Sequence, residues 1–224
     1  MKNILDFMQV VDEYQSYLVE KGVKFTSEGW PLMEREWFAE NIPDKIVPYL
    51  KRTDRRIKQY KSVAICFYTS DDEIYPRLEN VLENIEEYRK YEAVIESDLT
   101  VTWDMDEEWQ NIIILTNQLF MAILAVNGIK VIVNTRIGVV DDFSSLRYIP
   151  HGVICASGFL GCDRSSENDV AYITKILFLR PSNLLIYGKC SSNEIDQLDR
   201  FGIRYRVYKD YHSWSKKVGG KDGR

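Results

Sequence analysis

The chain has 224 residues, a formal net charge of -5, 45% hydrophobic residues and 28% charged residues. This composition supplies enough apolar material for a core, which excludes a chain that is disordered throughout. The acidic balance gives no support for wrapping duplex nucleic acid, although basic residues gather locally near residues 52–61 and 216–224.

The N-terminal region is predicted to form one helix and then an irregular segment. Apolar residues recur at helical spacing over residues 3–21, and Gly22 ends that helix. Residues 25–50 contain Pro31, Pro43 and Pro48 and predict a cap over one end of a sheet. The predicted organisation is an N-terminal helix (1–24), one α/β domain (25–212) and a mobile basic tail (213–224).

Short apolar runs in the rest of the chain predict β-strands. They cover residues 62–68, 93–95, 130–133, 153–156 and 183–187, with a sixth strand at 204–208. Amphipathic helical stretches separate most of these runs, which is typical of a largely parallel sheet. The sequence therefore predicts an α/β fold with five or six mainly parallel strands, as a partial barrel or as an open three-layer sheet.

Three further patterns bear on the location of the protein. The most apolar window, residues 112–126, is interrupted by Thr116, Asn117 and Gln118, so it predicts a buried helix and no membrane span. The start of the chain lacks the long apolar stretch of a secretory signal. The four cysteines form no close pair, which favours reduced thiols and a cytoplasmic protein.

Polar residues follow the predicted strands in an orderly way. Ligands bind at the carboxyl ends of the strands in parallel α/β folds, so these residues are candidates for a site. Asp98 is the candidate catalytic residue. The candidate binding residues are Asp71, Asp72, Thr100, Asn134, Arg136, Ser157, Gly188 and Lys189.

This arrangement permits phosphate chemistry. Asp98 and Asp71 could together hold Mg²⁺ or Mn²⁺, and Arg136 and Lys189 could neutralise a phosphate. A structural interpretation competes with this one. In it Asp71 and Asp72 cap the next helix, Arg136 is solvated or ion-paired, and Gly188 only turns the chain.

Motifs that would fix a reaction are missing from the sequence. It contains no GxGxxG, no GxxxxGK[ST] and no GxSxG, so a dinucleotide site, a P-loop and a serine hydrolase have no support. Cys155 lies within an apolar run and is predicted to be a core residue.

The order of several motifs resembles a known family. They are Phe67-Tyr-Thr-Ser-Asp-Asp-Glu73, Ser97-Asp98-Leu99-Thr100, Asn127-Gly128-Ile129, Val131-Ile-Val-Asn134, Ile149-Pro-His-Gly-Val153 and Leu179-Arg-Pro-Ser-Asn-Leu-Leu-Ile-Tyr-Gly188. Together, over roughly residues 25 to 210, they resemble domain of unknown function 4417, a family of bacteria, phages and mobile elements. The second strand of that family typically ends Pro-Asp-Phe-Ser, and Asp98 and Thr100 keep its acid and hydroxyl. The resemblance implies a phage, plasmid or prophage setting.

Two classes of function remain open from the sequence. We favour a binding or interaction module of a phage or mobile element, which contacts an unidentified protein or nucleic acid through its basic segments. The alternative is a divalent-metal-dependent enzyme that acts on a nucleotide or nucleic acid at the strand ends. The sequence does not decide whether the protein is an enzyme.

Overall fold

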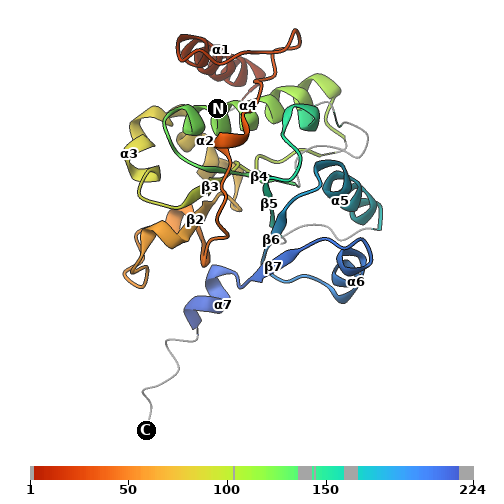
Figure 1. Ribbon diagram of the computed structural model, residues 1–224. Coiled ribbons are helices and arrows are strands. Elements are labelled where there is room, and N and C mark those ends of the chain that lie inside the picture. The colour runs from red at the N-terminus through yellow and green to blue at the C-terminus, as the bar shows by residue number, and fades with distance from the viewer. Residues whose placement is uncertain (1–2, 103, 136–142, 144, 159–165, 217–224) are drawn as a thin grey trace.

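The fold is an α/β arrangement built on one parallel sheet (Figure 1). A computed structural model describes residues 3–102, 104–135, 143, 145–158 and 166–216. The strands are β1 (Lys45–Pro48), β2 (Val63–Cys66), β3 (Ala93–Ile95), β4 (Val131–Asn134), β5 (Ile154–Gly158), β6 (Asn183–Tyr187) and β7 (Tyr205–Tyr208). Their order in the sheet follows their order in the chain, and each neighbouring pair is parallel.

Within the described residues the sheet has seven strands, so the predicted number of five or six was too low. The additional strand is β1, which lies in the segment that was predicted to be an irregular cap. It is short, and only Ile46 and Val47 are apolar and buried, so the sequence carries little strand pattern there. Pro48 is compatible with this strand because β1 is an edge strand and pairs on one side only.

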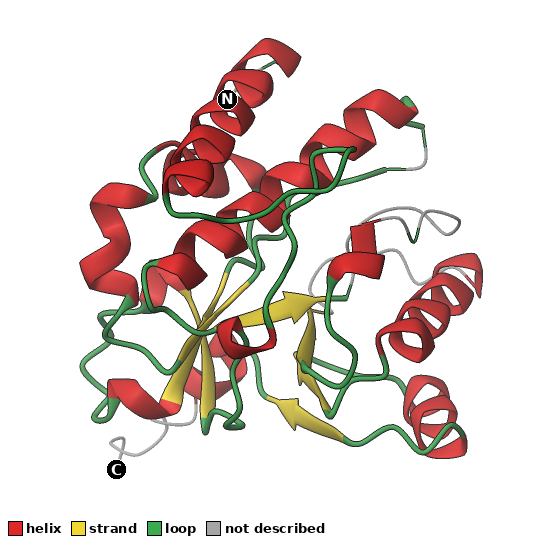
Figure 2. Ribbon diagram, turned by 45° about the horizontal axis from the view of Figure 1, so that its top comes forward, coloured by secondary structure: helices red, strands yellow, loops and turns green. Residues whose placement is uncertain are grey.

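Helices connect most of the strands and cover the outside of the sheet (Figure 2). They are α1 (Ile4–Glu20), α2 (Asp71–Glu79), α3 (Ile85–Tyr88), α4 (Glu107–Val126), α5 (Ser166–Leu179), α6 (Ser192–Arg200) and α7 (Tyr211–Lys216). Short 3₁₀ turns occur at η1 (Arg35–Trp37), η2 (Tyr49–Lys51), η3 (Tyr60–Ser62), η4 (Leu82–Asn84) and η5 (Ser145–Tyr148).

The amphipathic helical stretch between β2 and β3 is not one continuous helix but is broken into α2, η4 and α3. Two asparagine side chains explain the break. Asn80 Nδ2 donates to the carbonyl oxygen of Pro76 at 2.9 Å, and Asn84 Nδ2 donates to that of Asn80 at 2.7 Å. Such bonds offer the backbone carbonyls an alternative to the helical ladder. The pattern of apolar residues alone did not reveal this competition.

One apolar cluster shows that the sheet curves into a nearly closed barrel. Its members come from all seven strands, and they include Ile46, Ala64, Ile95, Ile132, Ala156, Leu185 and Tyr208. In a barrel, the inward-facing residues of all the strands share one interior. The hydroxyl of Tyr208 in β7 also donates to the carbonyl oxygen of Pro43, just before β1, at 2.6 Å. That bond bridges the two edges of the sheet.

The second and larger apolar cluster lies between the outer face of the sheet and the helices. It contains the alternate strand residues, among them Ile65, Val94 and Val133, together with the buried face of α4. Among the described helices, α4 alone has the length and hydropathy of a membrane span, but most of it is buried in the fold. It is therefore the core helix that the sequence predicted, and its N-terminus is capped by Asp106, which accepts from Trp109 N at 2.8 Å.

The helix predicted at the N-terminus is α1, and it packs against α4. At the other end, α7 occupies the start of the segment that was predicted to be a mobile tail. Residues 217–224 lie outside the described residues. The proposed division into a helix, a domain and a tail stays a prediction.

Candidate functional site at the carboxyl rim

The carboxyl ends of the seven parallel strands meet at one edge of the barrel, which we call the carboxyl rim. It consists of the last strand residues and the first residues of the loops that follow. Two groups of polar residues lie there. The polar cluster comprises Glu96, Ser97, Asp98, Asn117 and Asn134, and the basic cluster comprises Lys51, Arg52, Arg55, Arg56, Lys58, Lys189 and Lys209.

Asn134, at the end of β4, is the centre of the polar cluster. Its backbone N–H donates to Glu96 Oε2 at 3.0 Å, and its side-chain Nδ2 donates to Asp98 Oδ1 at 2.6 Å. Asn134 and Glu96 are buried, whereas Asp98 is half-buried. The structure thus brings together two predicted site residues, Asp98 and Asn134, from neighbouring strands.

The other side of the polar cluster comes from α4. Ser97 Oγ donates to Asn117 Oδ1 at 2.5 Å, and the next residue, Gln118, donates from Nε2 to the carbonyl oxygen of Ser145 at 2.8 Å. Asn117 and Gln118 are almost completely buried. The amide side chains of Asn117 and Gln118 therefore link α4 to the end of β3 and to the loop before β5.

Several buried polar atoms in this region have no hydrogen-bond partner among the described residues. They are Glu96 Oε1, Asn117 Nδ2, Gln118 Oε1 and Ser157 Oγ. Buried polar groups are normally satisfied by protein or by ordered water. The polar cluster and its surroundings thus retain hydrogen-bonding capacity that the described residues do not use.

Glu96 is an acid whose ionisation is strongly perturbed by its surroundings. Burial raises the pKa of Glu96 to about 8, the Asn134 N–H lowers it, and the nearby Asp98 raises it. Near neutral pH this carboxyl is therefore largely protonated, and its second oxygen can act as a donor. A neutral glutamic acid also avoids the cost of a buried charge.

Asp71 has a different partner from the one predicted. Its Oδ1 accepts hydrogen bonds from Thr100 N and Thr100 Oγ1, both at 3.1 Å. Asp71 is the first residue of α2, and the cap position before it is Ser70, whose side chain makes no capping bond. Asp71 therefore ties the loop after β3 to the start of α2. Asp72 is exposed in the first turn of the same helix.

The described acids form no large cluster of metal-ligating side chains. In the described part of the chain, no three side chains of the types His, Cys, Asp and Glu lie together as metal ligands would. Asp98 and Asp71 are each engaged in the hydrogen bonds given above. The paired metal ligation predicted for them stays a prediction.

The remaining predicted residues are spread around the rim. Ser157 is buried in β5. Gly188 follows β6 at a φ of 104°, which favours glycine, and its N–H donates to the carbonyl oxygen of Tyr208 at 2.9 Å. Lys189 is exposed beside it. Arg136 lies outside the described residues, so its predicted role in binding phosphate stays a prediction.

Stacked tyrosines fill the mouth of the barrel between the two clusters. The rings of Tyr68 and Tyr187 stack with centroids 5.6 Å apart and planes 23° apart. A Cβ on Gly158 would lie 2.5 Å from Cδ1 of Tyr68, so only glycine leaves room for this ring. The two rings therefore form a packed layer, which we call the tyrosine floor.

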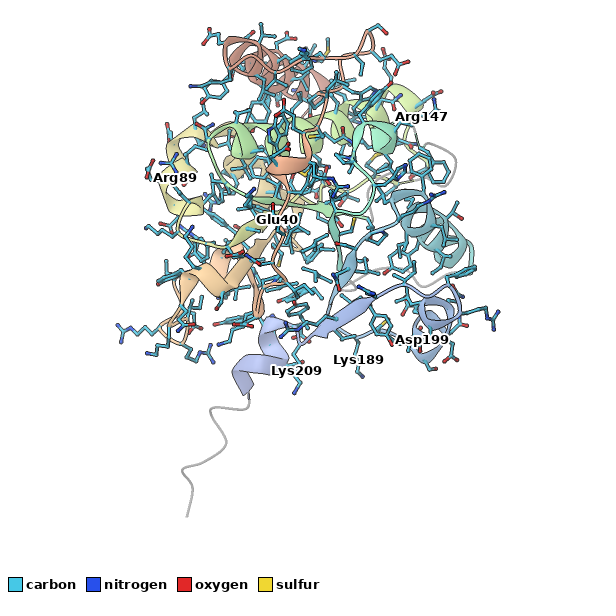
Figure 3. The ribbon with its side chains drawn as sticks, viewed as in Figure 1. Glu40, Arg89, Arg147, Lys189, Asp199 and Lys209 are labelled. Carbon is cyan, nitrogen blue, oxygen red and sulfur yellow. The ribbon has the colours of Figure 1, made fainter. Side chains whose placement is uncertain are left out.

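The basic cluster lies on the part of the rim formed by β1, β6 and β7. Tyr211 in α7 holds it together, because its hydroxyl donates to Asp54 Oδ2 at 2.6 Å and accepts from Arg56 Nη2 at 2.9 Å. Lys51 Nζ lies 5.9 Å from the centroid of the Tyr211 ring. Lys189 and Lys209 follow the neighbouring strands β6 and β7, as Figure 3 shows.

Electrostatics stabilises this junction. The hydrogen bonds from Arg56 and Tyr211 hold the pKa of Asp54 well below its usual range, so Asp54 is ionised near neutral pH. Two basic segments that are distant in the sequence, residues 49–62 and 209–216, therefore lie side by side.

Three features of the site were missed by reasoning from the sequence. Asn117 and Gln118 were noticed only as interruptions of an apolar window, although polar residues at buried helix positions are a signal for an internal network. The tyrosine floor had no recognisable spacing. The junction at Tyr211 could not be found, because its partners are more than 150 residues away.

Comparison with known families decides the classification. The family model described as domain of unknown function (DUF4417) matches residues 29–207. The protein belongs to this family. The DUF4417 match confirms the resemblance predicted from the sequence and covers β1 through most of β7, whereas α1 precedes it and α7 follows it. No curated protein and no solved structure gives a significant match.

Proposed function

We propose that the protein is a nucleic-acid-binding module that contacts phosphates through the basic cluster of the carboxyl rim. The observation that supports this most is the junction at Tyr211, which places two basic segments next to each other. Residues 49–62 contain six Lys or Arg and one acidic residue, and residues 209–224 contain five against two. The whole chain, in contrast, has a net charge of -5.

Exposure supports the same assignment. Lys51, Arg55, Lys58, Lys189 and Lys209 are all exposed, so their charges are accessible to a large polyanion. Arg and Lys side chains bind phosphate oxygens by charge-assisted hydrogen bonds, and much of the affinity for nucleic acid comes from such contacts. The polar cluster, by comparison, is too deeply buried to meet a polymer.

The setting of the protein is part of the proposal. We place it in the cytoplasm, as a protein of a phage or mobile element, because reduced cysteines and the family resemblance favour this. Such proteins encounter both single-stranded and duplex nucleic acid. The acidic remainder of the chain favours contact along one face and disfavours wrapping.

The test is fluorescence anisotropy with a labelled 20-nucleotide single strand and the corresponding duplex, between 50 and 200 mM salt. The double variant Arg55→Ala/Lys58→Ala should bind about tenfold more weakly at low salt. Each lost phosphate contact should flatten the dependence of log K on log salt by about 0.7 to 0.9. The matched control is Lys21→Ala/Lys24→Ala, which removes two exposed charges far from the rim.

The proposal fails if neither oligonucleotide binds, or if both double variants bind like the wild type. A repeat with Mn²⁺ tests the alternative function. Cleavage of the oligonucleotide that is lost in Asp98→Ala would support the metal-dependent enzyme in place of a simple binding module.

A further inference from the structure

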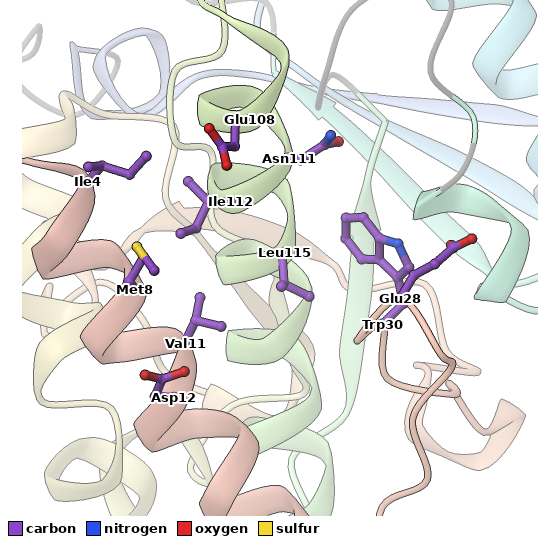
Figure 4. Close-up of a pocket in the computed structure, with 10 residues that line it drawn as sticks. All are labelled: Ile4, Met8, Val11, Asp12, Glu28, Trp30, Glu108, Asn111, Ile112 and Leu115. Atoms are coloured by element: carbon purple, nitrogen blue, oxygen red, sulfur yellow. The ribbon is translucent and has the colours of Figure 1, made fainter.

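A groove opens at the opposite end of the molecule from α7 (Figures 1 and 4). It lies between α1, α4 and residues 28–30, and its volume is about 500 Å³. The side chains that make its surface apolar are Ile4, Met8, Val11, Trp30, Ile112 and Leu115. Covering this surface with another apolar surface removes it from water and so lowers the free energy.

The wall formed by α1 is firmly held. On the buried face of α1, the ring of Phe7 packs edge-on against Trp109 with centroids 5.1 Å apart. The hydroxyl of Tyr14 donates to the carbonyl oxygen of Leu78, and that of Tyr17 donates to Asn127 Oδ1 at 3.0 Å. The groove is therefore a preformed feature of the fold.

The groove continues into exposed apolar surface on α1. Met8 is 48% exposed and Leu5 is 70% exposed, although the helix has buried residues of its own to pack. A contiguous apolar surface of this kind is typical of a site that contacts another molecule.

The charge of the groove identifies the kind of occupant. Three carboxylates line it, from Asp12, Glu28 and Glu108, and among the described lining residues none is Lys or Arg. Asp12 and Glu108 lie on the two helices that form the walls (Figure 4). An occupant with apolar side chains flanked by basic ones would match both features.

Two occupants from the chain itself fit poorly. A second α1 would bring like charges together, because residues 4–20 contain four acidic residues and no Lys or Arg. The basic residues 217–224 contain a single apolar side chain, Val218, which cannot cover the apolar surface. Neither of these segments therefore matches both the apolar surface and the acidic rim of the groove.

We propose that this groove is the docking site for a basic amphipathic helix of a partner protein. A helix laid between two helices presents apolar residues three or four positions apart to the groove and basic residues to its rim. One wall of the groove, α1, precedes the residues matched by the family model, and the other, α4, lies within them. The site is separate from the basic cluster.

The proposal is tested with the full-length protein and two labelled synthetic helices. One probe carries leucines at helical spacing flanked by lysines, and the other has glutamates in place of the lysines. The lysine probe should bind, and Met8→Asp should weaken binding at least tenfold. The control Val19→Asp, at a more exposed position of α1 outside the groove, should leave binding unchanged.

Hydrogen exchange locates the probe. Protection should appear in residues 4–12 and 108–115, and circular dichroism of each variant confirms that α1 still folds. Equal binding of both probes, or equal loss in Met8→Asp and Val19→Asp, would overturn the proposal. A dimer of the protein alone that Met8→Asp dissociates would overturn it in favour of a second copy.

Discussion

The two halves of the carboxyl rim both carry polar or charged side chains, but they differ in charge and in burial. At the ends of β3 and β4, Glu96 and Asn134 are almost fully enclosed and bond to each other. At the ends of β1, β6 and β7, the basic cluster remains in water, and only its junction at Tyr211 is fixed. Polar residues at strand ends thus serve structure where they are buried and recognition where they are exposed.

The difference has an energetic basis. A buried polar group that loses its partner costs about 1–3 kcal/mol, whereas an exposed ion pair contributes about 0–1 kcal/mol. We therefore expect substitutions in the polar cluster to change stability, and substitutions in the basic cluster to change binding. Four predictions test this contrast, from the largest expected effect on stability to the smallest.

Glu96 should make stability depend on pH. Below a pH of about 4.3 its carboxyl is protonated in both the folded and the unfolded chain. As the pH rises toward 8, the unfolded chain loses this proton while the folded protein keeps it, because burial raises the pKa of Glu96 to about 8. The free energy of unfolding should therefore fall across this window, by on the order of 4 kcal/mol.

Urea denaturation of the wild type and of Glu96→Gln between pH 5 and 8.5 measures this effect. The variant mimics the protonated acid, so it should be the more stable protein at pH 8.5 and show little difference near pH 5. Glu83→Gln, at an exposed position, is the control. Parallel curves for Glu96→Gln and the wild type would contradict a buried, neutral Glu96.

Gly158 should be sensitive to the smallest added side chain. Its Cβ would overlap the ring of Tyr68, so Gly158→Ala should destabilise the protein by about 1–3 kcal/mol. A double-mutant cycle with Tyr68→Leu checks the cause. The cost of Gly158→Ala should shrink when the ring is removed, and a cost that is the same in both backgrounds would exclude this contact as its source.

Asp71 and Asp72 form a matched pair with unequal roles. Asp71→Asn should lower the free energy of unfolding by about 1 kcal/mol, since Thr100 N and Oγ1 lose a charged acceptor. Asp72→Asn, next to it and exposed, should have a smaller effect. Thermal unfolding of both variants measures the difference, and a larger loss for Asp72→Asn would restore the simple capping interpretation.

Tyr211→Phe should have the smallest effect on stability, less than about 1 kcal/mol, because the junction that it loosens is close to solvent. It removes the hydroxyl that bridges Asp54 and Arg56. If the basic cluster acts as a unit, oligonucleotide binding should weaken severalfold while the melting temperature barely moves. A large fall in melting temperature would show that this half of the rim is also structural.

Much of the fold was predictable because local patterns carry it. The apolar runs identified six of the seven strands, and the long apolar window with Asp106 before it located α4. β1 was not predicted, because a four-residue edge strand with two apolar residues has almost no recognisable pattern of apolar residues. The break in the helix after α2 was not predicted, because the hydrogen bonds of Asn80 and Asn84 that cause it depend on the geometry of the side chains.

The sequence predicted the location of the candidate site better than the roles of its residues. The rule for parallel strands correctly placed Asp98 and Asn134 together at the rim. It could not tell which strand ends would be buried, because burial depends on how α4 and the loops cover them. The partners of Asp71 and Tyr211 depend on contacts between segments far apart in the chain, which periodicity does not encode.

The two edge strands of the sheet, β1 and β7, also bear on the solubility of the protein. The sheet stops at seven strands, so each of these two edge strands has a row of peptide groups without a neighbouring strand. Such edges can recruit strands from other chains and seed aggregation. Here Pro43 and Pro48 flank and end β1, and Lys45 and Arg206 place charges on the two edges. Together with the Tyr208 bond to Pro43, these residues protect the edge strands of an incomplete barrel from pairing with strands of other chains.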